Sequence, residues 1–406
     1  MPATEYQGSF LGRISIRRNQ VSSLENNQEQ ELEDLELFQR HISDRFADLI
    51  VPAPDDPPAS PHHHHHQPNP DNVLSISWLR KLLDAFLCCE AEFKAVLIMG
   101  RDPAHVAKPP LDRLIPELMD RVVRALDLCN AITHGVDSVM QCQRLAEIAA
   151  SALERRPFGE GQVKRAKRAL TTLLSLMDDK ENTNSSFKAA ERNWSFGRRG
   201  SGAAGANKDP HMANFRCLTM SVSKNWSASK QIQAMMGNLA APRGNEASGL
   251  AVPVYIMSSV IVFAMWALVA AIPCHERSGL STHFPVPRQL SWAQSMIGLQ
   301  ERIAEDWKKK EKKGSAGLME EMQKMEKLGT ALVDFADGFQ FPAEAEKEEV
   351  AAGQVCELVE VCRRLDEGLL PLQQQIREVF HRMVRSRTEI LELLDQASKA
   401  AANPVA

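Results

Sequence analysis

The sequence LAVPVYIMSSVIVFAMWALVAAI occupies residues 250–272 and contains no charged side chain, although 25% of the whole chain is charged. Its only proline, Pro253, lies in the first turn, where the missing N–H does little harm to a helix. A helix over these residues would be about 34 Å long at ~1.5 Å per residue, which is enough to cross a bilayer core of about 30 Å. A helix that is apolar on every side can equally form the centre of a large soluble bundle.

The residues around this stretch leave both environments open. Leu250 and Ile272 are the candidate ends of the helix, and Trp266 lies in its middle, whereas membrane helices place aromatic side chains at their ends. Two basic residues lie within about twenty positions on each side, namely Lys230 and Arg243 before it and Arg277 and Arg288 after it. Because the basic residues are balanced, the positive-inside rule assigns no orientation. The sequence therefore predicts either a membrane-spanning helix or a buried core helix.

The composition of the chain argues against several classes of protein. The 406 residues are 44% hydrophobic and carry a formal net charge of −4, so the chain can bury a large core and nucleic acid is not the expected partner. Only 6% of the residues are aromatic, which disfavours a large β-sandwich. The eight cysteines lack C-x-x-C or framework spacing, and the N-terminus lacks the features of a signal peptide. These features predict a cytosolic protein with reduced thiols and with no cofactor or metal site.

Apolar residues recur at helical spacing over much of the remaining chain. One stripe covers residues 32–49, a second covers residues 76–97, and a third covers residues 115–139. The third stripe predicts a helix or a helix pair that ends near residue 156. Glu90 interrupts the second stripe at a position where an apolar residue is due.

The C-terminal third has the most regular pattern. Residues 292–337 predict one highly charged helix. From residue 355 to residue 393 the apolar side chains keep a heptad spacing, and Ser386 fills the one missing position. Gly368 and Pro371 fall inside this pattern, so it predicts either a hairpin of two helices or one kinked rod.

These patterns together predict an all-α fold, an elongated multi-helix bundle with a coiled-coil-like C-terminal region and one strongly hydrophobic helix. Changes in composition divide the chain into six segments. They are an N-terminal basic arm and amphipathic helix (1–50), a Pro/His-rich linker (51–71), a helical bundle (72–177), a basic loop region rich in Gly, Ser and Asn (178–248), the hydrophobic helix that is a transmembrane candidate (249–274), and charged helices with a heptad seam (275–406).

Short motifs point to regulation rather than to catalysis. Residues 200–205 read GSGAAG, but no strand precedes them and no helix follows, so they predict a flexible loop and not a dinucleotide site. The five histidines at residues 62–66 lie between prolines and predict low-complexity chain. Arg198 and Arg199 precede Ser201, which is a candidate phosphorylation site for a kinase that selects basic sequences. No catalytic motif occurs, so we expect a protein that is not an enzyme.

Five stretches carry a family resemblance. They are YQGSFLGRISIRR at 6–18, NWSFG at 193–197, WSASK at 226–230 with LAAPR at 239–243, MWALVAAIPC at 265–274, and REVFHRMVRSRT at 377–388. With these stretches the chain resembles the plant BYPASS-related ROH family over nearly its whole length. The resemblance implies binding to exocyst subunits of the Exo-seventy class and a role in polarised secretion, including mucilage deposition. It supplies no catalytic residues.

The patterns and the resemblance together predict a cytosolic adaptor or regulator that is not an enzyme and that binds helical partners of the exocytic machinery. We expect the heptad region to provide the partner-binding face, through Leu365, Leu372, Ile376, Val379 and Met383. Basic residues of the central loop and of the N-terminal arm predict possible association with anionic membranes. The alternative is a single-pass endomembrane protein that restrains the production or export of a small mobile growth signal, a role implied by the BYPASS branch.

Overall fold

The structure is a computed structural model, and it describes residues 24–50, 73–98, 106, 108–178, 226–244, 249–274, 279–311, 317–341 and 344–402. Within these ranges the chain is helical and contains no strand, which confirms the predicted all-α fold. The helices are α2 (Leu24–Asp48), α3 (Ile76–Ile98), α4 (Leu111–Ala152), α5 (Glu160–Met177), α7 (Ala228–Gly237), α8 (Ala251–Ala271), the short 3-10 helix η5 (Ser291–Ala293), α9 (Gln294–Glu311), α10 (Glu320–Asp337) and α11 (Ala345–Ala402).

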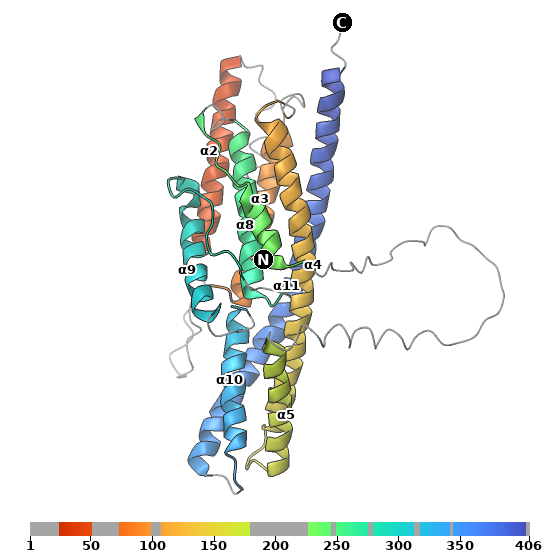
Figure 1. Cartoon of the computed structure of the whole chain (residues 1–406). Coiled ribbons are helices and arrows are strands. Elements are labelled where there is room, and N and C mark those ends of the chain that lie inside the picture. The colour runs from red at the N-terminus through yellow and green to blue at the C-terminus, as the bar shows by residue number, and fades with distance from the viewer. Residues whose placement is uncertain are drawn as a thin grey trace, which may run out of the picture.

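The helices form an elongated bundle with two halves (Figure 1). In one half, α5 and α10 pack against the C-terminal part of α4 and the N-terminal part of α11. In the other half, α2, α3, α4, α7 and α9 gather around α8, and the C-terminal part of α11 packs on α3 and α4. The long helices α4 and α11 are antiparallel and run through both halves, and one hydrophobic core extends from Leu35 to Ile390. The predicted segments 72–177, 249–274 and 275–406 therefore share a single core.

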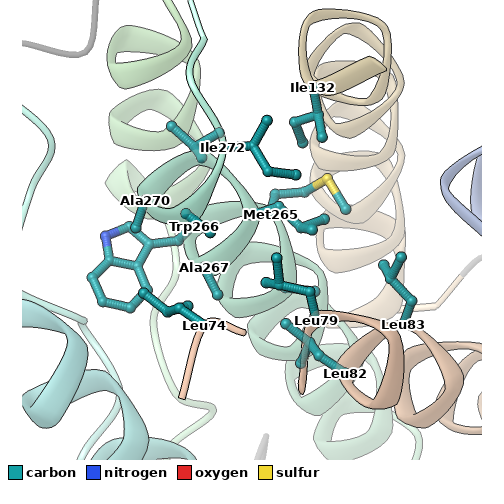
Figure 2. Close-up of a cluster of buried hydrophobic side chains, with 14 of the residues drawn as sticks. Leu74, Leu79, Leu82, Leu83, Ile132, Met265, Trp266, Ala267, Ala270 and Ile272 are labelled. Atoms are coloured by element: carbon teal, nitrogen blue, oxygen red, sulfur yellow. The ribbon is translucent and has the colours of Figure 1, made fainter. Parts of the chain in front are cut away.

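The uncharged stretch forms α8, a helix at the centre of the bundle. Every residue of α8 except Val252 is buried, and so are Leu250 and Ile272, the predicted ends. Figure 2 shows its side chains among Leu79 of α3 and Ile132 of α4. Within the described ranges, α8 is the one helix that is long and apolar enough to cross a membrane, yet its apolar window is completely buried inside the protein. Of the two environments that the sequence left open, this fold uses the buried core.

The heptad region forms one continuous helix, α11, rather than a hairpin. Gly368 lies where α11 crosses the start of α3, and the absence of a side chain allows this close approach to Ile76. Pro371 also lies inside the helix. Because proline has no N–H, the carbonyl of Glu367 loses its helical donor, and the helix is locally weakened there.

The prediction of one helix over residues 292–337 is wrong, because the chain forms α9 and α10 there. Gly317 adopts a φ of 85°, which interrupts the helical conformation before α10 begins. Leu318 then donates a backbone hydrogen bond to the carbonyl of Ala270 in α8, at 2.9 Å. Charged residues recur in the sequence on both sides of the break, so the charge pattern alone could not reveal it.

Several predictions fall on residues outside the described ranges. These are the basic arm before residue 24, the whole of the Pro/His-rich linker, and the loop that contains Ser201. They remain predictions.

Replacement of Gly368 by alanine is expected to lower the free energy of unfolding by about 2 kcal/mol. A Cβ at this position would lie 2.4 Å from Cγ2 of Ile76, which leaves no room for a methyl group. In an Ile76→Ala background the same replacement should cost much less, because the clashing methyl is gone. Gly353→Ala is the control, since no described atom lies within 4 Å of its Cβ position, and it should be neutral or stabilising by about 0.5–1 kcal/mol. Urea unfolding that finds equal effects at both glycines would contradict the close contact.

Candidate functional site

The structure places the predicted partner-binding face inside the protein. Its five residues are at most 2% exposed, and they belong to the common core: Leu365, Leu372, Ile376, Val379 and Met383. In this bundle other helices of the same chain cover the heptad seam, so the contact of these residues with a partner stays a prediction. A charged substitution at one of these positions would test the fold rather than the binding of a partner.

Polar contacts hold α11 on both of its flanks. Toward α3, the side chain of Gln375 accepts a hydrogen bond from Arg80 Nε at 3.1 Å and donates one to Asp84 Oδ1 at 2.7 Å. Toward α4, Gln373 Nε2 donates to Asp137 Oδ1 at 3.0 Å. These contacts fix the register of α11 against its two neighbours.

The two residues that break the apolar stripes meet between α3 and α11. The Ser386 hydroxyl donates a hydrogen bond to Glu90 Oε1, and Arg382 Nη1 lies 3.6 Å from Glu90 Oε2. Glu90 is only 4% exposed, so its carboxylate is held inside the interface. We call Glu90, Arg382, Ser386 and the adjacent Arg387 the polar layer.

The polar layer is incompletely satisfied. Among the described residues, neither Glu90 Oε2 nor Arg387 Nε has a hydrogen-bond partner, although both atoms are buried. Beside them lies a cavity of about 20 Å³, which has room for roughly one water molecule. Glu90, Ser386 and Arg387 of the polar layer line this cavity. The rest of its wall is apolar and consists of Phe86, Phe93, Leu118, Met119, Val122, Met257, Ile261, Met383 and Ile390. Buried polar atoms without partners weaken an interface, so they offset part of the stabilisation that the Ser386 and Arg382 contacts give to the packing of α3 on α11.

Burial raises the pKa of Glu90 above its ordinary value of 4.5, although the Ser386 hydroxyl and the cations of Arg382 and Lys94 oppose the shift and Glu389 adds to it. The folded chain therefore binds the proton of Glu90 more tightly than the unfolded chain does. This contribution to stability is present at acidic pH and is lost as the pH rises through the raised pKa.

Glu90→Gln is expected to gain stability relative to the wild type as the pH increases from about 4.5 to about 7.5. The reason is that glutamine stays neutral, whereas the buried carboxyl must ionise. Urea unfolding of both proteins at several pH values measures the difference. Parallel stability curves would show that burial of the charge costs nothing.

A second feature lies on the outside of α11. Val384 and Leu391 remain 39% and 38% exposed on the flank that lies toward α4. The helices α4 and α11 are antiparallel, and Asp137 contacts Gln373. Residue 123 lies at the level of residue 387, because each is fourteen residues from that contact (137 − 123 = 387 − 373 = 14). Val123 of α4 is 41% exposed. Its level along the bundle falls between those of Val384 and Leu391. Half-buried apolar residues of the same two helices lie at neighbouring levels: Leu126, Phe380 and Leu394.

We call these six residues the outer strip. The heptad pattern did not reveal the outer strip, because the members of the strip lie outside the seam. A signal was nevertheless present, since Leu370, Val384 and Leu391 recur at multiples of seven residues on one flank of the helix.

Other clusters of reactive side chains have a structural role. Glu92 of α3 accepts hydrogen bonds from Arg45 and contacts His41 Nδ1 at 3.2 Å, which joins α3 to α2. Burial raises the pKa values of the Cys89 and Cys129 thiols to about 12, so both remain protonated at neutral pH and are poor nucleophiles. Within the described ranges, no group of three or more His, Cys, Asp or Glu side chains is arranged to hold a metal ion.

The comparison with known families decides the relationship of the chain. The family described as "Protein ROH1-like" matches residues 1–394. The chain belongs to this family. The resemblance to plant ROH proteins is thereby confirmed over almost the whole length of the chain.

Two members of the ROH1 group from Arabidopsis thaliana are similar from end to end. Protein ROH1A is 57% identical over 412 residues, which cover 99% of this chain and 99% of the relative. Protein ROH1D is 42% identical over 416 residues, which cover 97% of this chain and 98% of the relative. No solved structure matches the chain. The names of these ROH1 relatives refer to no enzymatic reaction.

Proposed function

We propose that this ROH1-like protein is a cytosolic adaptor, not an enzyme, that binds an exocyst subunit of the Exo-seventy class and acts in polarised secretion. Its membership of the ROH1-like family supports this role. The structural observation that carries the proposal is the outer strip, where apolar side chains of α4 and α11 remain exposed at neighbouring levels of two adjacent helices.

The outer strip has the properties of a docking site for a helix. Val384 and Leu391 lie about two turns apart on one flank, and this spacing matches the periodicity of an amphipathic partner helix. Polar residues at the same levels are exposed on α11, namely His381, Thr388 and Asp395. Apolar anchors would then contribute most of the affinity, and this polar rim would contribute specificity.

A pair of exposed substitutions tests the proposal without disturbing the core. Val384→Asp with Leu391→Asp is expected to weaken binding to a purified Exo-seventy-class subunit about tenfold or more, because charges replace the apolar anchors. The matched control is Val359→Asp with Leu370→Asp, which changes the same residue types at 51% and 58% exposure elsewhere on α11. The control should bind as the wild type does. Calorimetry that finds no binding by the wild type, or equal binding by all three proteins, would refute the proposal.

The proposed location is the cytosol, with contact to membranes made through the partner. The buried position of α8 supports this location over a membrane span. Carbonate extraction of cell membranes tests it, because a peripheral protein is released and a spanning protein stays in the pellet. Retention in the pellet would favour the alternative, a single-pass endomembrane protein.

A further inference from the structure

We propose that the C-terminal arm of α11, residues 372–402, is a releasable element that opens at the polar layer, with Pro371 as its hinge, and so exposes its heptad seam to the partner. The identity of the partner rests on the proposed function, whereas the opening of the arm is a property of this chain alone. In this mechanism the outer strip makes the first contact, and the released seam completes the interface.

The hinge, Pro371, follows shortly after a fixed point of α11. On the N-terminal side of Pro371, Gly368 packs directly on Ile76, so this part of α11 cannot shift without moving the start of α3. Three residues further along, Pro371 leaves the carbonyl of Glu367 without its helical donor. Helices bend preferentially at such positions, and the segment beyond can then move as a rigid arm.

The apolar seam of α11 is interrupted on the C-terminal side of the hinge. On the N-terminal side of the hinge, Leu358 and Leu365 of one heptad series are fully buried. On the C-terminal side of the hinge, Ser386 and the half-buried Leu393 occupy two successive positions of the same heptad series. This heptad series therefore lacks a fully buried apolar side chain at two successive positions, whereas Met383 and Ile390 of the other series stay at most 2% exposed.

The polar layer adds a second weakness at the same level. Glu90 Oε2 and Arg387 Nε are buried and have no hydrogen-bond partner among the described residues, and a cavity adjoins them. Opening the arm would hydrate both groups and fill the cavity with solvent. Part of the cost of separating the helices is thereby offset at this layer.

The released arm would present a helix suited to a helical partner. Ile376, Val379, Met383 and Ile390 form one apolar stripe, and each of them is at most 2% exposed in the closed bundle. Their three- and four-residue spacing is the pattern by which amphipathic helices enter apolar surfaces. The residues that the heptad pattern singled out would thus contact a partner only after the arm has opened.

Hydrogen exchange of the isolated full-length chain tests the opening. We expect backbone amides in residues 380–397 to exchange about tenfold faster or more than those in residues 355–369, although both segments belong to one helix. In Glu90→Met with Ser386→Ala the two polar partners are removed together, so exchange of residues 380–397 should slow toward that of residues 355–369. Equal protection on both sides of Pro371 in the wild type would overturn the proposal.

Binding experiments test the coupling to the partner. Glu90→Met with Ser386→Ala should bind the Exo-seventy-class subunit about tenfold more weakly, because it holds the arm closed. Ser386→Asp places a second carboxylate beside Glu90 and should have the opposite effect, with faster exchange and tighter binding. Lys164→Met with Glu160→Met removes an exposed ion pair within α5, away from the arm, and should bind as the wild type does.

The outcomes of these experiments separate the two proposals. If the closed-arm variant exchanges slowly but binds as the wild type does, release of the arm is not required and this inference fails, while the outer strip can still be the docking site. If Ser386→Asp weakens binding, the inference also fails. If the wild type does not bind the subunit at all, the proposed function fails, and the exchange experiment still decides whether the arm opens.

Discussion

Replacement of Gly135 by alanine should lower the free energy of unfolding by about 3 kcal/mol. Gly135 lies in α4, where this helix crosses the end of α8. A Cβ at this position would lie 2.3 Å from the carbonyl oxygen of Pro273 and 2.7 Å from Cγ2 of Ile272. The first of these atoms belongs to the backbone and cannot rotate away. The clash can be relieved only if α4 and α8 separate, which would disrupt the packing around the fully buried Ile272.

Gly298→Ala in α9 provides the matched control. It is also a helical glycine, but no described atom lies within 4 Å of its Cβ position. We expect it to be neutral or stabilising by about 0.5–1 kcal/mol, because alanine has the higher helix propensity. Urea unfolding monitored by circular dichroism compares the two variants. A Gly135→Ala protein as stable as the wild type would mean that α4 and α8 are not in this contact.

Trp266→Ala is expected to cost about 4 kcal/mol, because it removes the largest side chain of α8 from the core. Trp266 is fully buried, and its ring lies 6.1 Å from the ring of Phe263. Its Nε1 donates a hydrogen bond of 2.8 Å to the carbonyl of Ser281, so the substitution also leaves that carbonyl without its donor.

The size of this effect depends on the environment of α8. Trp266→Phe keeps an aromatic ring but loses the hydrogen bond, and it should cost about 1–2 kcal/mol. If α8 faced lipid instead of α3 and α4, truncation of Trp266 would leave no cavity in the protein. Urea or thermal unfolding that finds a cost below about 1 kcal/mol for Trp266→Ala would therefore contradict the buried position of the helix.

The position of α8 along the chain could be predicted from the sequence, but its surroundings could not. The uncharged stretch predicted a helix from residue 250 to residue 272, and the observed helix is Ala251–Ala271. Its composition is the same whether the neighbours are lipid chains or the leucines of α3. Only the tertiary structure shows that protein covers it.

The functional site could be predicted only in part, for a related reason. The heptad pattern correctly indicated which residues of α11 would be buried, but a periodic pattern does not say whether the covering helix belongs to the same chain. Glu90 and Ser386 were each visible as a break in an apolar stripe. They are almost three hundred residues apart in sequence, so their meeting depends on how α3 and α11 are aligned, which neither stripe specifies alone.

The place of α8 in the chain also determines when its surroundings are synthesised. Four of the helices that pack against it, α2, α3, α4 and α7, precede it in the sequence, whereas α9 follows. When α8 leaves the ribosome, most of the surface that will cover it has already been translated. A segment with the length and polarity that a translocon accepts therefore meets its own chain first. This order of synthesis favours the packing of the central helix against its own chain over its insertion into a membrane.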